Sequence, residues 1–346
     1  MLLAFDVGNT NIVLGVFKDG EMITNWRLET DNRKSADEYG MIINQLFQYE
    51  KLDFADVEDV IIATVVPSIL YTLQHLSQKY FNTRAIVIGP GIKTGLIVKY
   101  DNPKQVGADR IVNAVAAHAK YGGPLIIIDL GTATTFCALT PNAEYIGGTI
   151  APGLKISSDA LFEKTAKLPK VELEEPGHVI CRNTINSMQS GLVYGHMGLV
   201  EFIVRRMKKE LAEYCAADGV REEDIKVIAT GGLATMIDQG VDCIDYVDKL
   251  LTLEGLELIY RKNKKCRKQA TQEEIEKDHT VYKADATAIA MELGNPRCFN
   301  VVILGMAARH MDYAVEDWYK VIERTVKPKT IEINKKAFDA GYALAE

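Results

Sequence analysis

The sequence LLAFDVGNTNIVLGVF at residues 2–17 has a close counterpart in LIIIDLGTATTFCAL at residues 125–139. Each copy is an apolar run that ends in an aspartate, Asp6 or Asp129, followed by one apolar residue, a glycine, a short polar stretch and a second apolar run. A turn-rich segment and a third strand-like piece follow each copy. Two copies of one supersecondary unit, about a domain length apart, predict a duplicated α/β fold.

The residue types of the two copies suit phosphate binding. Glycines such as Gly8 and Gly131 let the backbone approach a phosphate closely. Threonine and asparagine groups donate hydrogen bonds to phosphate oxygens without adding charge. An aspartate repels phosphate but can hold a hard cation, or the water of that cation. A single Asp-x-Gly turn is common between strands, but a matched pair favours a nucleotide and its metal held from two sides.

Composition limits the other functions. The 346 residues are 47% hydrophobic and 25% charged, which is typical of a globular protein and predicts two domains with an appendage. The net charge of −7 argues against a nucleic-acid partner. No apolar run approaches the ~18 residues of a membrane span, and Asp6 leaves no room for a signal peptide, so we expect a cytoplasmic protein. The six cysteines and six histidines are scattered, which predicts reduced thiols and no zinc site.

Strand and helix patterns alternate along the chain, as expected for an α/β layer fold. In the first half we expect strands within 1–30 and at 59–66 and 84–89, and helices at 35–50, 68–80 and 109–120. In the second half we expect strands within 125–150 and at 226–230, and helices at 184–216 and 251–263. Gly191, Gly195 and Gly198 have near-helical spacing, which indicates close helix packing. Residues 261–268 (RKNKKCRK) are interpreted as the start of a solvated tether.

The segment Gly107-Ala108-Asp109-Arg110 opens a predicted helix between the two phosphate-type copies. An acid beside a cation in a first helical turn suits a general base paired with an anion clamp. It is equally the pattern of an aspartate favoured by the helix dipole beside a surface arginine. The sequence has no G-x-x-x-x-G-K-[ST] motif, which excludes a P-loop kinase, and the glycines at 89–95 lack dinucleotide-loop spacing.

Taken together, these motifs resemble the type III pantothenate kinases from residue 1 to about residue 263. The matching segments, in chain order, are DVGNTNIVLGVF (6–17), GPGIKTG (89–95), GADRIVNA (107–114), DLGTATTFC (129–137), GGTIAPG (147–153), TAKLP (165–169), SMQSG after Asn183-Thr184 (187–191) and ATGGLA (229–234).

The resemblance implies the ASKHA fold, in which two ribonuclease H-like domains flank a nucleotide cleft. The domains would be residues 1–120 and 121–263, followed by a linker at 264–282 and a partial α/β tail at 283–346. It also implies ATP-dependent phosphorylation of pantothenate, the first step of coenzyme A biosynthesis, with Mg²⁺, a monovalent cation (K⁺ or NH₄⁺) and a homodimer.

The family's functional residues carry over by position. Asp129 is expected to bind the monovalent cation, Thr132 to belong to the second phosphate loop, and Asp109 to be the base that takes the proton of the substrate hydroxyl. Gly231 and Gly232 would face the adenosine. The first phosphate loop would comprise Asp6, Val7, Gly8, Asn9, Thr10, Asn11, Ile12 and Val13, with Asp6 near Mg²⁺. The expected pantothenate contacts are Tyr100, Gly107, Ala108, Asp109, Arg110 and, at a dimer interface, Thr184.

Residues 286–346 resemble the C-terminal end of the gamma-type domain of 2-oxoacid:ferredoxin oxidoreductases. They show no thiamine diphosphate motif and no cysteine-rich cluster motif, so we interpret the tail as a fused fragment without a redox role. We expect it to contain helices at 283–293 and 315–326, a strand at 300–305 and an extended TIEIN segment.

Two alternatives to the kinase are a non-catalytic ATP-binding regulator on the same fold and a kinase of another sugar or acid.

Overall fold

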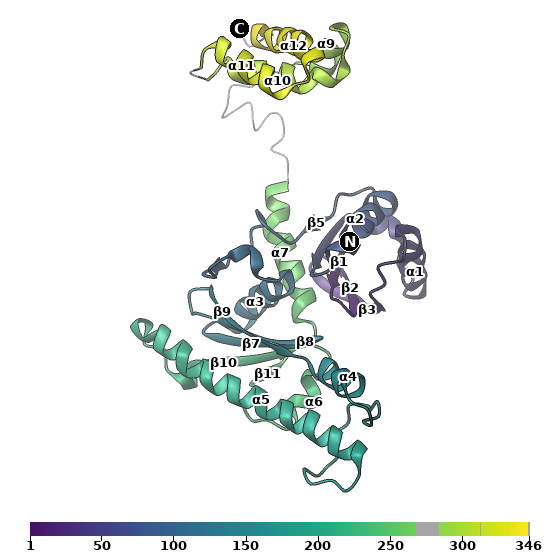
Figure 1. Ribbon diagram of the computed structural model, residues 1–346, viewed down its shortest axis with the longest axis vertical. Coiled ribbons are helices and arrows are strands. Elements are labelled where there is room, and N and C mark those ends of the chain that lie inside the picture. Colours follow the sequence, from purple (N-terminus) through teal and green to yellow (C-terminus); the bar gives the residue numbers. More distant parts are fainter. Residues whose placement is uncertain (268–283, 312, 345–346) are drawn as a thin grey trace. The chain divides into compact units, whose positions relative to one another are not determined.

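The computed structural model divides into two units, Met1–Arg267 and Lys268–Glu346 (Figure 1). The first unit contains two sheets of the same topology. The structure describes residues 1–267, 284–311 and 313–344. The first sheet contains, in spatial order, β3 (Glu21–Glu29), β2 (Asn11–Lys18), β1 (Leu2–Val7), β4 (Asp59–Thr64) and β5 (Ile86–Val87). The second contains β11 (Tyr246–Val247), β10 (Lys226–Thr230), β7 (Leu125–Leu130), β8 (Ala133–Leu139), β9 (Glu144–Pro152) and β6 (Ile97–Val98).

The second sheet repeats the pairing of the first strand by strand. β1 is antiparallel to β2 and parallel to β4, and β7 is antiparallel to β8 and parallel to β10. The third strand of each meander, β3 or β9, pairs antiparallel with the second, and β5 or β11 extends the parallel side. β6 adds an edge strand beside β9. The expected duplicated ribonuclease H-like fold is therefore confirmed.

Each sheet carries helices on its faces (Figure 1). The helices of this unit are α1 (Ala36–Tyr49), α2 (Pro67–Phe81), α3 (Ala108–Tyr121), α4 (Leu154–Lys164), α5 (Thr184–Tyr214), α6 (Ala234–Asp238) and α7 (Leu251–Arg267). Single 3₁₀ turns occur at Phe54–Asp56, Pro103–Gln105, Ala216–Asp218 and Glu222–Asp224. The predicted elements of this unit are thus present, with ends shifted by a few residues.

Strand alternation decides where the two motif aspartates point. β1 and β7 are buried along their length except at Asp6 and Asp129, which are partly exposed. Asp6 shares its face of β1 with Leu2 and Ala4, whose core cluster includes residues of α3 and α7. Asp129 shares its face of β7 with Leu125 and Ile127, whose cluster also includes residues of α3 and α7. Both carboxylates therefore point toward the layer of α3 and α7.

Helices α3 and α7 pack directly on each other (Figure 1). A Cβ atom placed on Gly255 of α7 would be 2.3 Å from the carbonyl oxygen of Val112 in α3, so only glycine permits this approach. Val112 and Leu256 pack with the first sheet's cluster, while Ala114 and Leu251 pack with the second sheet's cluster. The helix pair thus connects the cores beneath the two sheets.

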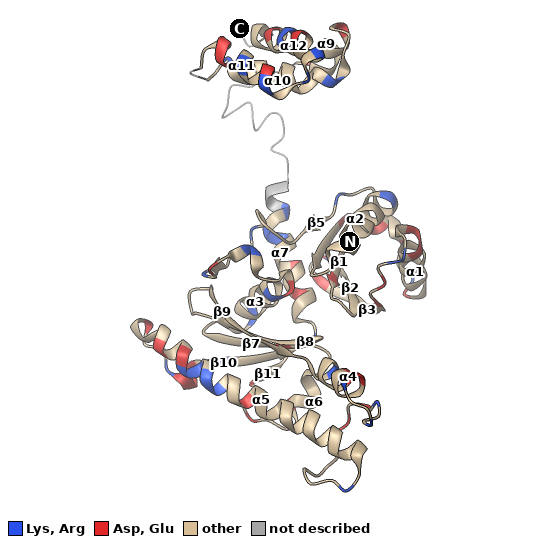
Figure 2. Ribbon diagram, in the orientation of Figure 1, with Lys and Arg blue, Asp and Glu red and all other residues tan. Residues whose placement is uncertain are grey.

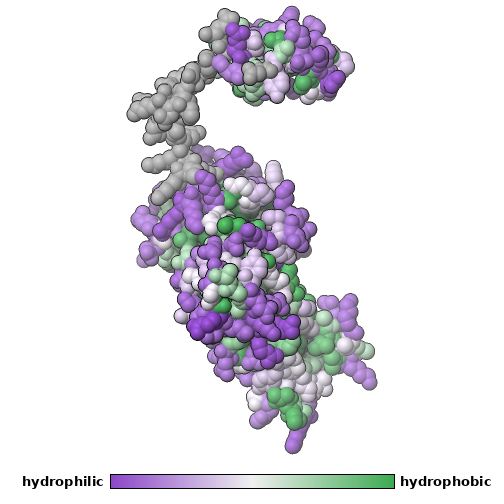
Figure 3. Space-filling view, turned by 90° about the vertical axis from the view of Figure 1, so that its left-hand side faces the viewer, coloured by the Kyte–Doolittle hydropathy of each residue, from purple (hydrophilic) through white to green (hydrophobic). Residues whose placement is uncertain are grey.

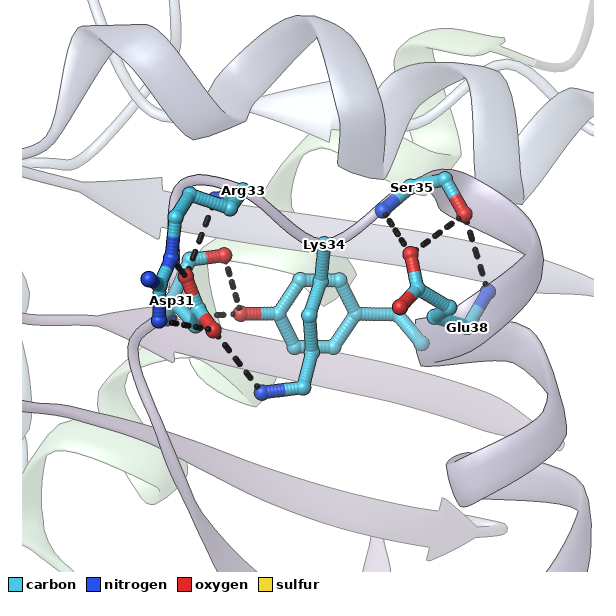
Figure 4. Close-up of polar contacts among 6 residues, drawn as sticks. Asp31, Arg33, Lys34, Ser35 and Glu38 are labelled. Atoms are coloured by element: carbon cyan, nitrogen blue, oxygen red, sulfur yellow. Dashed lines mark hydrogen bonds and ion pairs between the residues drawn. The ribbon is translucent and has the colours of Figure 1, made fainter.

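Helix α1 begins with the capping box that its sequence predicts. The Ser35 hydroxyl accepts a hydrogen bond from the Glu38 N–H (3.3 Å), and the Glu38 carboxylate accepts one from the Ser35 N–H (2.8 Å), as Figure 4 shows. Just before the cap, Asp31 accepts from Arg33 and Lys34, and these contacts lower the pKa of the Asp31 carboxyl. The turn between β3 and α1 is therefore fixed by local side-chain contacts.

The basic run that follows residue 260 differs from the expected tether. Helix α7 continues to Arg267, and its last turns contact the loop at 89–95. The Asn263 side chain accepts from the Lys93 N–H (3.1 Å) and donates to the Lys93 carbonyl (2.9 Å), and Lys262 donates to the Thr94 carbonyl (2.7 Å). The interpretation as a solvated segment is wrong for these residues because they extend an amphipathic helix. The remainder of the predicted linker, from residue 268, lies outside the described residues.

The tail is helical in its described part, which corrects the predicted partial α/β layer. Its helices are α9 (Ala286–Glu292), α10 (Phe299–Ala308), α11 (Val315–Thr325) and α12 (Ile331–Leu344), with 3₁₀ turns at Pro296–Cys298 and Pro328–Thr330. The expected strand at 300–305 lies within α10, because a short apolar run does not distinguish a strand from a buried helix. The expected extended TIEIN segment mostly lies in α12, whose buried positions Asn334, Ala337, Phe338 and Gly341 follow helical spacing.

Close packing of α10 on α12 explains why this helical arrangement wins. A Cβ atom on Gly305 would be 2.0 Å from the Phe338 carbonyl oxygen, and one on Gly341 would be 1.9 Å from the Val302 carbonyl oxygen. Glycines on both helices let the two backbones meet, and α10 buries Val302, Gly305 and Ala308. Among the described residues of the whole chain, no helix is both long and apolar enough to cross a bilayer.

Candidate active site

A cavity of about 380 Å³ lies where the two phosphate-type copies, the start of α3 and the start of α7 meet. The strand ends β1 and β7 each deliver an aspartate and the loop that follows it. The lining residues are Asp6, Val7, Gly8, Asn9, Thr10, Asn11, Val13, Arg27, Val65, Asp109, Asp129, Gly131, Thr132, Ala133, Thr135, Thr230, Gly231, Gly232, Lys249, Thr252 and Leu253. Segments far apart in the sequence therefore form one site.

The two loops touch each other across the cavity. The hydroxyl oxygens of Thr10 and Thr132 are 3.0 Å apart, which is hydrogen-bond distance. Each loop is a tight turn after its strand: the Gly8 N–H donates to the Asn11 carbonyl (2.9 Å), and the Gly131 N–H donates to the Ala133 carbonyl (3.1 Å). The pair presents hydroxyl and amide donors from both sheets to one small volume.

Three carboxylates share this cavity: Asp6, Asp109 and Asp129. Burial, and then the charges of Asp129 and Asp109, raise the pKa of Asp6 to about 8, against a smaller opposing effect of Arg27. Burial and the charge of Asp109 raise the pKa of Asp129 to about 6, while a hydrogen bond from Asn113 opposes the rise. Like charges close together in a poorly solvated site favour the arrival of a cation.

Asp109 stands at the beginning of α3, after Gly107. Its Oδ1 accepts a hydrogen bond from the Arg110 N–H (2.8 Å). Burial raises its pKa, and the N–H and charge of Arg110 partly counteract this. A Cβ atom on Gly107 would be 2.4 Å from the same Oδ1, so glycine gives the carboxylate room to fold back over the helix start. A carboxylate of raised pKa in a cavity suits a general base.

Arg110 points into a separate polar cluster next to the cavity. Its Nε donates to the Cys137 thiol sulfur at 3.3 Å, and its guanidinium lies 5.7 Å from the ring centre of Tyr145. Tyr145 also donates to the Cys137 sulfur (3.4 Å), and the Tyr100 ring lies 6.4 Å from the Tyr145 ring. Arg110 is 6% exposed, and its Nη2 has no hydrogen-bond partner among the described residues. This buried cation with a free donor is suited to an anionic ligand.

The structure brings most of the predicted site residues together. Eight of the nine positions expected to bind ATP, all except Ile12, line the cavity together with Asp109, Asp129, Gly231 and Gly232. Ile12 is 1% exposed and belongs to the core of the first sheet, because it alternates with the cavity-facing Val13 on β2. Of the expected pantothenate contacts, only Asp109 lines the cavity, while Tyr100 and Arg110 lie beside it. Thr184 lies elsewhere, in an open depression at the start of α5.

Several lining residues were missed by the sequence analysis. Arg27 of β3 and Lys249 before α7 bring positive charge to the cavity, and Thr252 lies in the first turn of α7. Asn113 of α3 donates to the Asp129 Oδ2 at 3.2 Å. Of these four residues, only Asn113 stood within a recognised segment, the GADRIVNA motif, and its place one helical turn after Asp109 was the available signal.

The side chains that line the cavity suit a metal ion that is held mainly by the phosphates of a bound ligand and only in part by protein groups. No group of three or more His, Cys, Asp or Glu side chains in the described residues is arranged to hold a metal ion by itself. Mg²⁺ typically takes one or two carboxylates together with phosphates and water, and two of the carboxylates, Asp6 and Asp129, come from the matched strand ends. The cavity therefore suits a metal that arrives with a phosphate ligand.

Comparison with known proteins identifies two families. A family model described as type III pantothenate kinase matches residues 2–206. A second, described as pyruvate ferredoxin/flavodoxin oxidoreductase, matches residues 177–344, so it covers the tail and also reaches into the first unit. Both expected resemblances are confirmed.

Three of the solved structures that the comparison found differ in their described roles. A protein described as a Baf family transcriptional activator from Campylobacter jejuni is 19% identical, with a TM-score of 0.46, covering 76% of this chain and 99% of that one. The ethanolamine utilization protein EutJ from Carboxydothermus hydrogenoformans is 16% identical, with a TM-score of 0.40, covering 74% and 89%. A ROK family glucokinase from Streptomyces griseus, in complex with glucose and AMPPNP, is 13% identical, with a TM-score of 0.40, covering 76% and 99%.

The shifted pKa of Asp6 predicts a pH-dependent stability. Because folding raises this pKa from 3.8 to about 8, the folded chain binds more protons than the unfolded chain between these values, and its stability falls as the pH rises. Asp6→Asn cannot ionise and escapes this loss. We therefore compare the melting temperatures of Asp6→Asn and the unsubstituted chain, both without nucleotide or metal. The difference between them, Asp6→Asn minus unsubstituted, should increase from pH 5 to pH 8.

Thermal melts at pH 5, 6.5 and 8 would measure this difference. Asp37→Asn serves as the control, since ion pairing with Lys79 lowers the pKa of Asp37 below the range tested. Its melting-temperature difference should stay constant over the range. A constant difference for Asp6→Asn as well would show that Asp6 does not carry the raised pKa.

Proposed function

The chain belongs to the type III pantothenate kinase family, and we propose that it transfers the terminal phosphoryl group of ATP to the terminal hydroxyl of pantothenate, the first step of coenzyme A biosynthesis. Membership of this family makes it a kinase, a phosphotransferase that uses ATP with Mg²⁺. The observation that carries the proposal is the cavity in which two phosphate-type loops, joined at Thr10 and Thr132, face the Asp109 carboxylate.

Phosphoryl transfer depends on positioning and charge neutralisation more than on covalent chemistry. The N–H and hydroxyl groups of the two loops suit the β- and γ-phosphates, and Arg27 and Lys249 add positive charge to the same cavity. Mg²⁺ bound with ATP would neutralise phosphate charge, and Asp6 is the residue we assign to its side of the site. Asp129 is assigned to the monovalent cation, K⁺ or NH₄⁺. Gly231 and Gly232, which also line the cavity, are assigned to the adenosine.

The base we assign is Asp109. Its raised pKa makes it a better proton acceptor than an ordinary surface carboxylate, and the Arg110 N–H fixes one of its oxygens. The other oxygen can then accept the proton of the substrate hydroxyl as the phosphoryl group arrives. Its position beside both phosphate loops supports this role.

Asp109→Asn should reduce kcat by about 10²- to 10⁴-fold, because the amide cannot accept the hydroxyl proton. ATP affinity, measured by calorimetry, should stay within about twofold of the unsubstituted chain, since Asn keeps the shape of Asp. Asp101→Asn is the matched control, because Asp101 is an exposed aspartate in the preceding loop. Full activity in Asp109→Asn would remove Asp109 from the base role.

We assign Arg110 to the carboxylate of pantothenate, with Tyr100, Gly107 and Ala108 forming the surrounding wall. The Nη2 group of Arg110 is buried and lacks a partner among the described residues, while its Nε is already held by Cys137. A substrate carboxylate would complete its hydrogen bonds. Since Asp109 and Arg110 are consecutive, the carboxylate end and the reacting hydroxyl end of one small molecule could both be held near the start of α3.

Arg110→Gln should raise the KM for pantothenate by about 10- to 100-fold, the cost of one charge-assisted hydrogen bond, with a smaller change in kcat. An analogue in which an alcohol replaces the carboxylate should be used equally by Arg110→Gln and by the unsubstituted chain. Steady-state kinetics with both substrates would measure these effects. Arg221→Gln, which alters an exposed arginine paired with Glu223 and Asp224, is the control. An unchanged KM in Arg110→Gln would exclude the carboxylate assignment.

A homodimer formed through α5 would account for the position of Thr184. Thr184, Gly191, Gly195, Gly198 and Phe202 recur on one face of this helix at spacings of seven, four, three and four residues. Cβ atoms on the three glycines would meet no described residue outside the helix's own backbone within 4 Å, so in the described part of the chain these glycines do not make the close packing that the sequence suggested. Residues 184–200 contain no Lys, Arg, Asp or Glu, as the tan first half of α5 in Figure 2 shows. A second copy could pack closely along this stripe.

Exposed apolar residues continue the surface beyond the stripe. In the loop before α5, Val179 is 70% exposed and Ile180 is 91% exposed, and Figure 3 shows apolar surface at the lower end of this unit, where that loop lies in Figure 1. Apolar surface of this kind marks an interface. We propose that Thr184 completes the pantothenate site across this interface, as the family assignment implies.

Gly195→Arg should convert the dimer to a monomer, because a long charged side chain cannot fit a close helix contact. Sedimentation velocity would show the change of mass, and pantothenate phosphorylation should fall at least tenfold while ATP binding persists. Glu201→Arg is the control, because position 201 lies about a third of a turn around the helix from position 195. An unsubstituted chain that sediments as a monomer would contradict the interface.

The kinase assay itself separates the proposed function from its alternatives. The full chain is incubated with ATP, Mg²⁺ and pantothenate, in K⁺ and then in Na⁺. Potassium-dependent product supports the proposal. ATP binding without product from pantothenate would favour the non-catalytic regulator, and product from a sugar or another acid would favour a different kinase. The residues that line the cavity all belong to the first unit, so we attribute the reaction to residues 1–267.

A further inference from the structure

A chain of hydrogen bonds connects α7 to Asp129 through a buried asparagine. The Thr252 hydroxyl contacts the Asn113 Oδ1 at 2.7 Å, and the Asn113 Nδ2 contacts the Asp129 Oδ2 at 3.2 Å. Asn113 is 2% exposed, and the three residues come from α7, α3 and β7. The family assignment gives a role only to Asp129, so Asn113 and Thr252 are unexplained polar groups at the site.

The donor and acceptor pattern fixes the direction of this chain. Asp129 as a carboxylate can only accept, so the Asn113 side chain must turn its NH₂ group toward it. The amide oxygen then faces Thr252, whose hydroxyl donates to it. Turning the amide over would set its oxygen against the carboxylate oxygen, two acceptors with no proton between them, and the Asp129 oxygen would lose its donor, which is costly. Each of the two contacts therefore holds the other in place.

The consequence for Asp129 is that its two oxygens have different roles. Oδ2 is held by Asn113, while Oδ1 has no donor among the described residues and lies at the corner formed by Gly131 and Gly231. A Cβ atom would be 3.4 Å from Oδ1 at Gly131 and 2.7 Å from it at Gly231. The two glycines thus keep space beside Oδ1, and this space belongs to the cavity that both line.

Without such a restraint the carboxylate would have reason to turn away. Asp6 and Asp109 are negative groups in the same cavity, and Arg27 and Lys249 are the positive groups that line it. The neighbouring carboxylates repel Asp129, and a single-bond rotation would move its oxygens. The Asn113 hydrogen bond opposes that rotation.

We propose that Asn113 and Thr252 are positioning residues, which fix the Asp129 carboxylate so that Oδ1 faces the glycine corner and can bind the monovalent cation that accompanies the nucleotide. This inference rests on the cation assignment in the proposed function. It also gives the first turn of α7 a role at the cation site, through Thr252.

The test measures cation binding rather than turnover. The full chain is mixed with Mg²⁺ and a non-hydrolysable ATP analogue, and its melting temperature is followed as K⁺ replaces N-methylglucamine at constant ionic strength. Calorimetry gives the analogue's affinity at the two limits. The variants are Thr252→Val, Thr252→Ser, Asn113→Ala and the double variant Asn113→Ala with Thr252→Val. Thr252→Val keeps the shape of the side chain, which guards against loss of folding.

We expect Thr252→Val and Asn113→Ala to raise the half-saturating K⁺ concentration by about tenfold, the usual effect of removing a group that orients a metal ligand. Thr252→Ser, which keeps the hydroxyl, should restore the original value to within about threefold. The double variant should match Asn113→Ala, because the threonine acts only through the asparagine.

The control is Asn263→Ala, which removes side-chain hydrogen bonds near the other end of the same helix, about 16 Å away along its axis. Its K⁺ response should be unchanged. An unaltered response in Thr252→Val and Asn113→Ala, or additive effects in the double variant, would overturn the proposal. So would an unsubstituted chain whose nucleotide binding ignores K⁺. A chain that binds the analogue in a K⁺-dependent way but does not phosphorylate pantothenate would refute the proposed substrate and still support the positioning role.

Discussion

The repulsion among three partly buried carboxylates is the constraint around which this site is organised. Asp6, Asp109 and Asp129 line one cavity; burial raises the pKa of each, and the charges of neighbouring carboxylates raise those of Asp6 and Asp129 further. Such a cluster is unfavourable in the ligand-free chain and becomes favourable when cations and a phosphate chain enter together. The surrounding features supply partial compensation: Arg27 and Lys249 at the cavity wall, and hydrogen-bond donors that hold individual carboxylate oxygens.

The duplicated fold explains how two of these carboxylates come to face each other. Each lies near the end of a central strand, on the face that packs against α3 and α7, because strand residues alternate between faces. The third carboxylate comes from the first turn of α3 itself. A glycine in α7 lets the two helices meet at backbone distance, and this contact sets the spacing between the sheets' cores. The chemistry of the site thus depends on helix packing as well as on the strands.

The two units of the chain contrast in how far their sequences specify them. In the first unit, strand patterns, the Ser35 capping box and the glycine turns all agree, and the expected elements are present. In the tail, the apolar run of α10 and the alternating TIEIN segment favour strands locally. The close packing of α10 on α12, at Gly305 and Gly341, overrides that preference. Local patterns failed where a tertiary contact decided between two structures of similar local preference.

The sequence by itself determined the duplication, the two aspartate-glycine loops, the GADR helix start and the family, because each depends on residues adjacent in the chain. It did not indicate Arg27, Lys249 or Thr252, since nothing in their neighbourhoods distinguishes them from surface residues. Ile12 shows the converse: it lies within the first loop's motif, yet strand alternation sends its side chain to the core. Only the tertiary structure brought β3, the segment before α7 and the buried amide of Asn113 to the carboxylates. Some of these contacts join residues more than a hundred positions apart, as Thr252 and Asn113 do. The others join elements whose packing no local sequence pattern encodes.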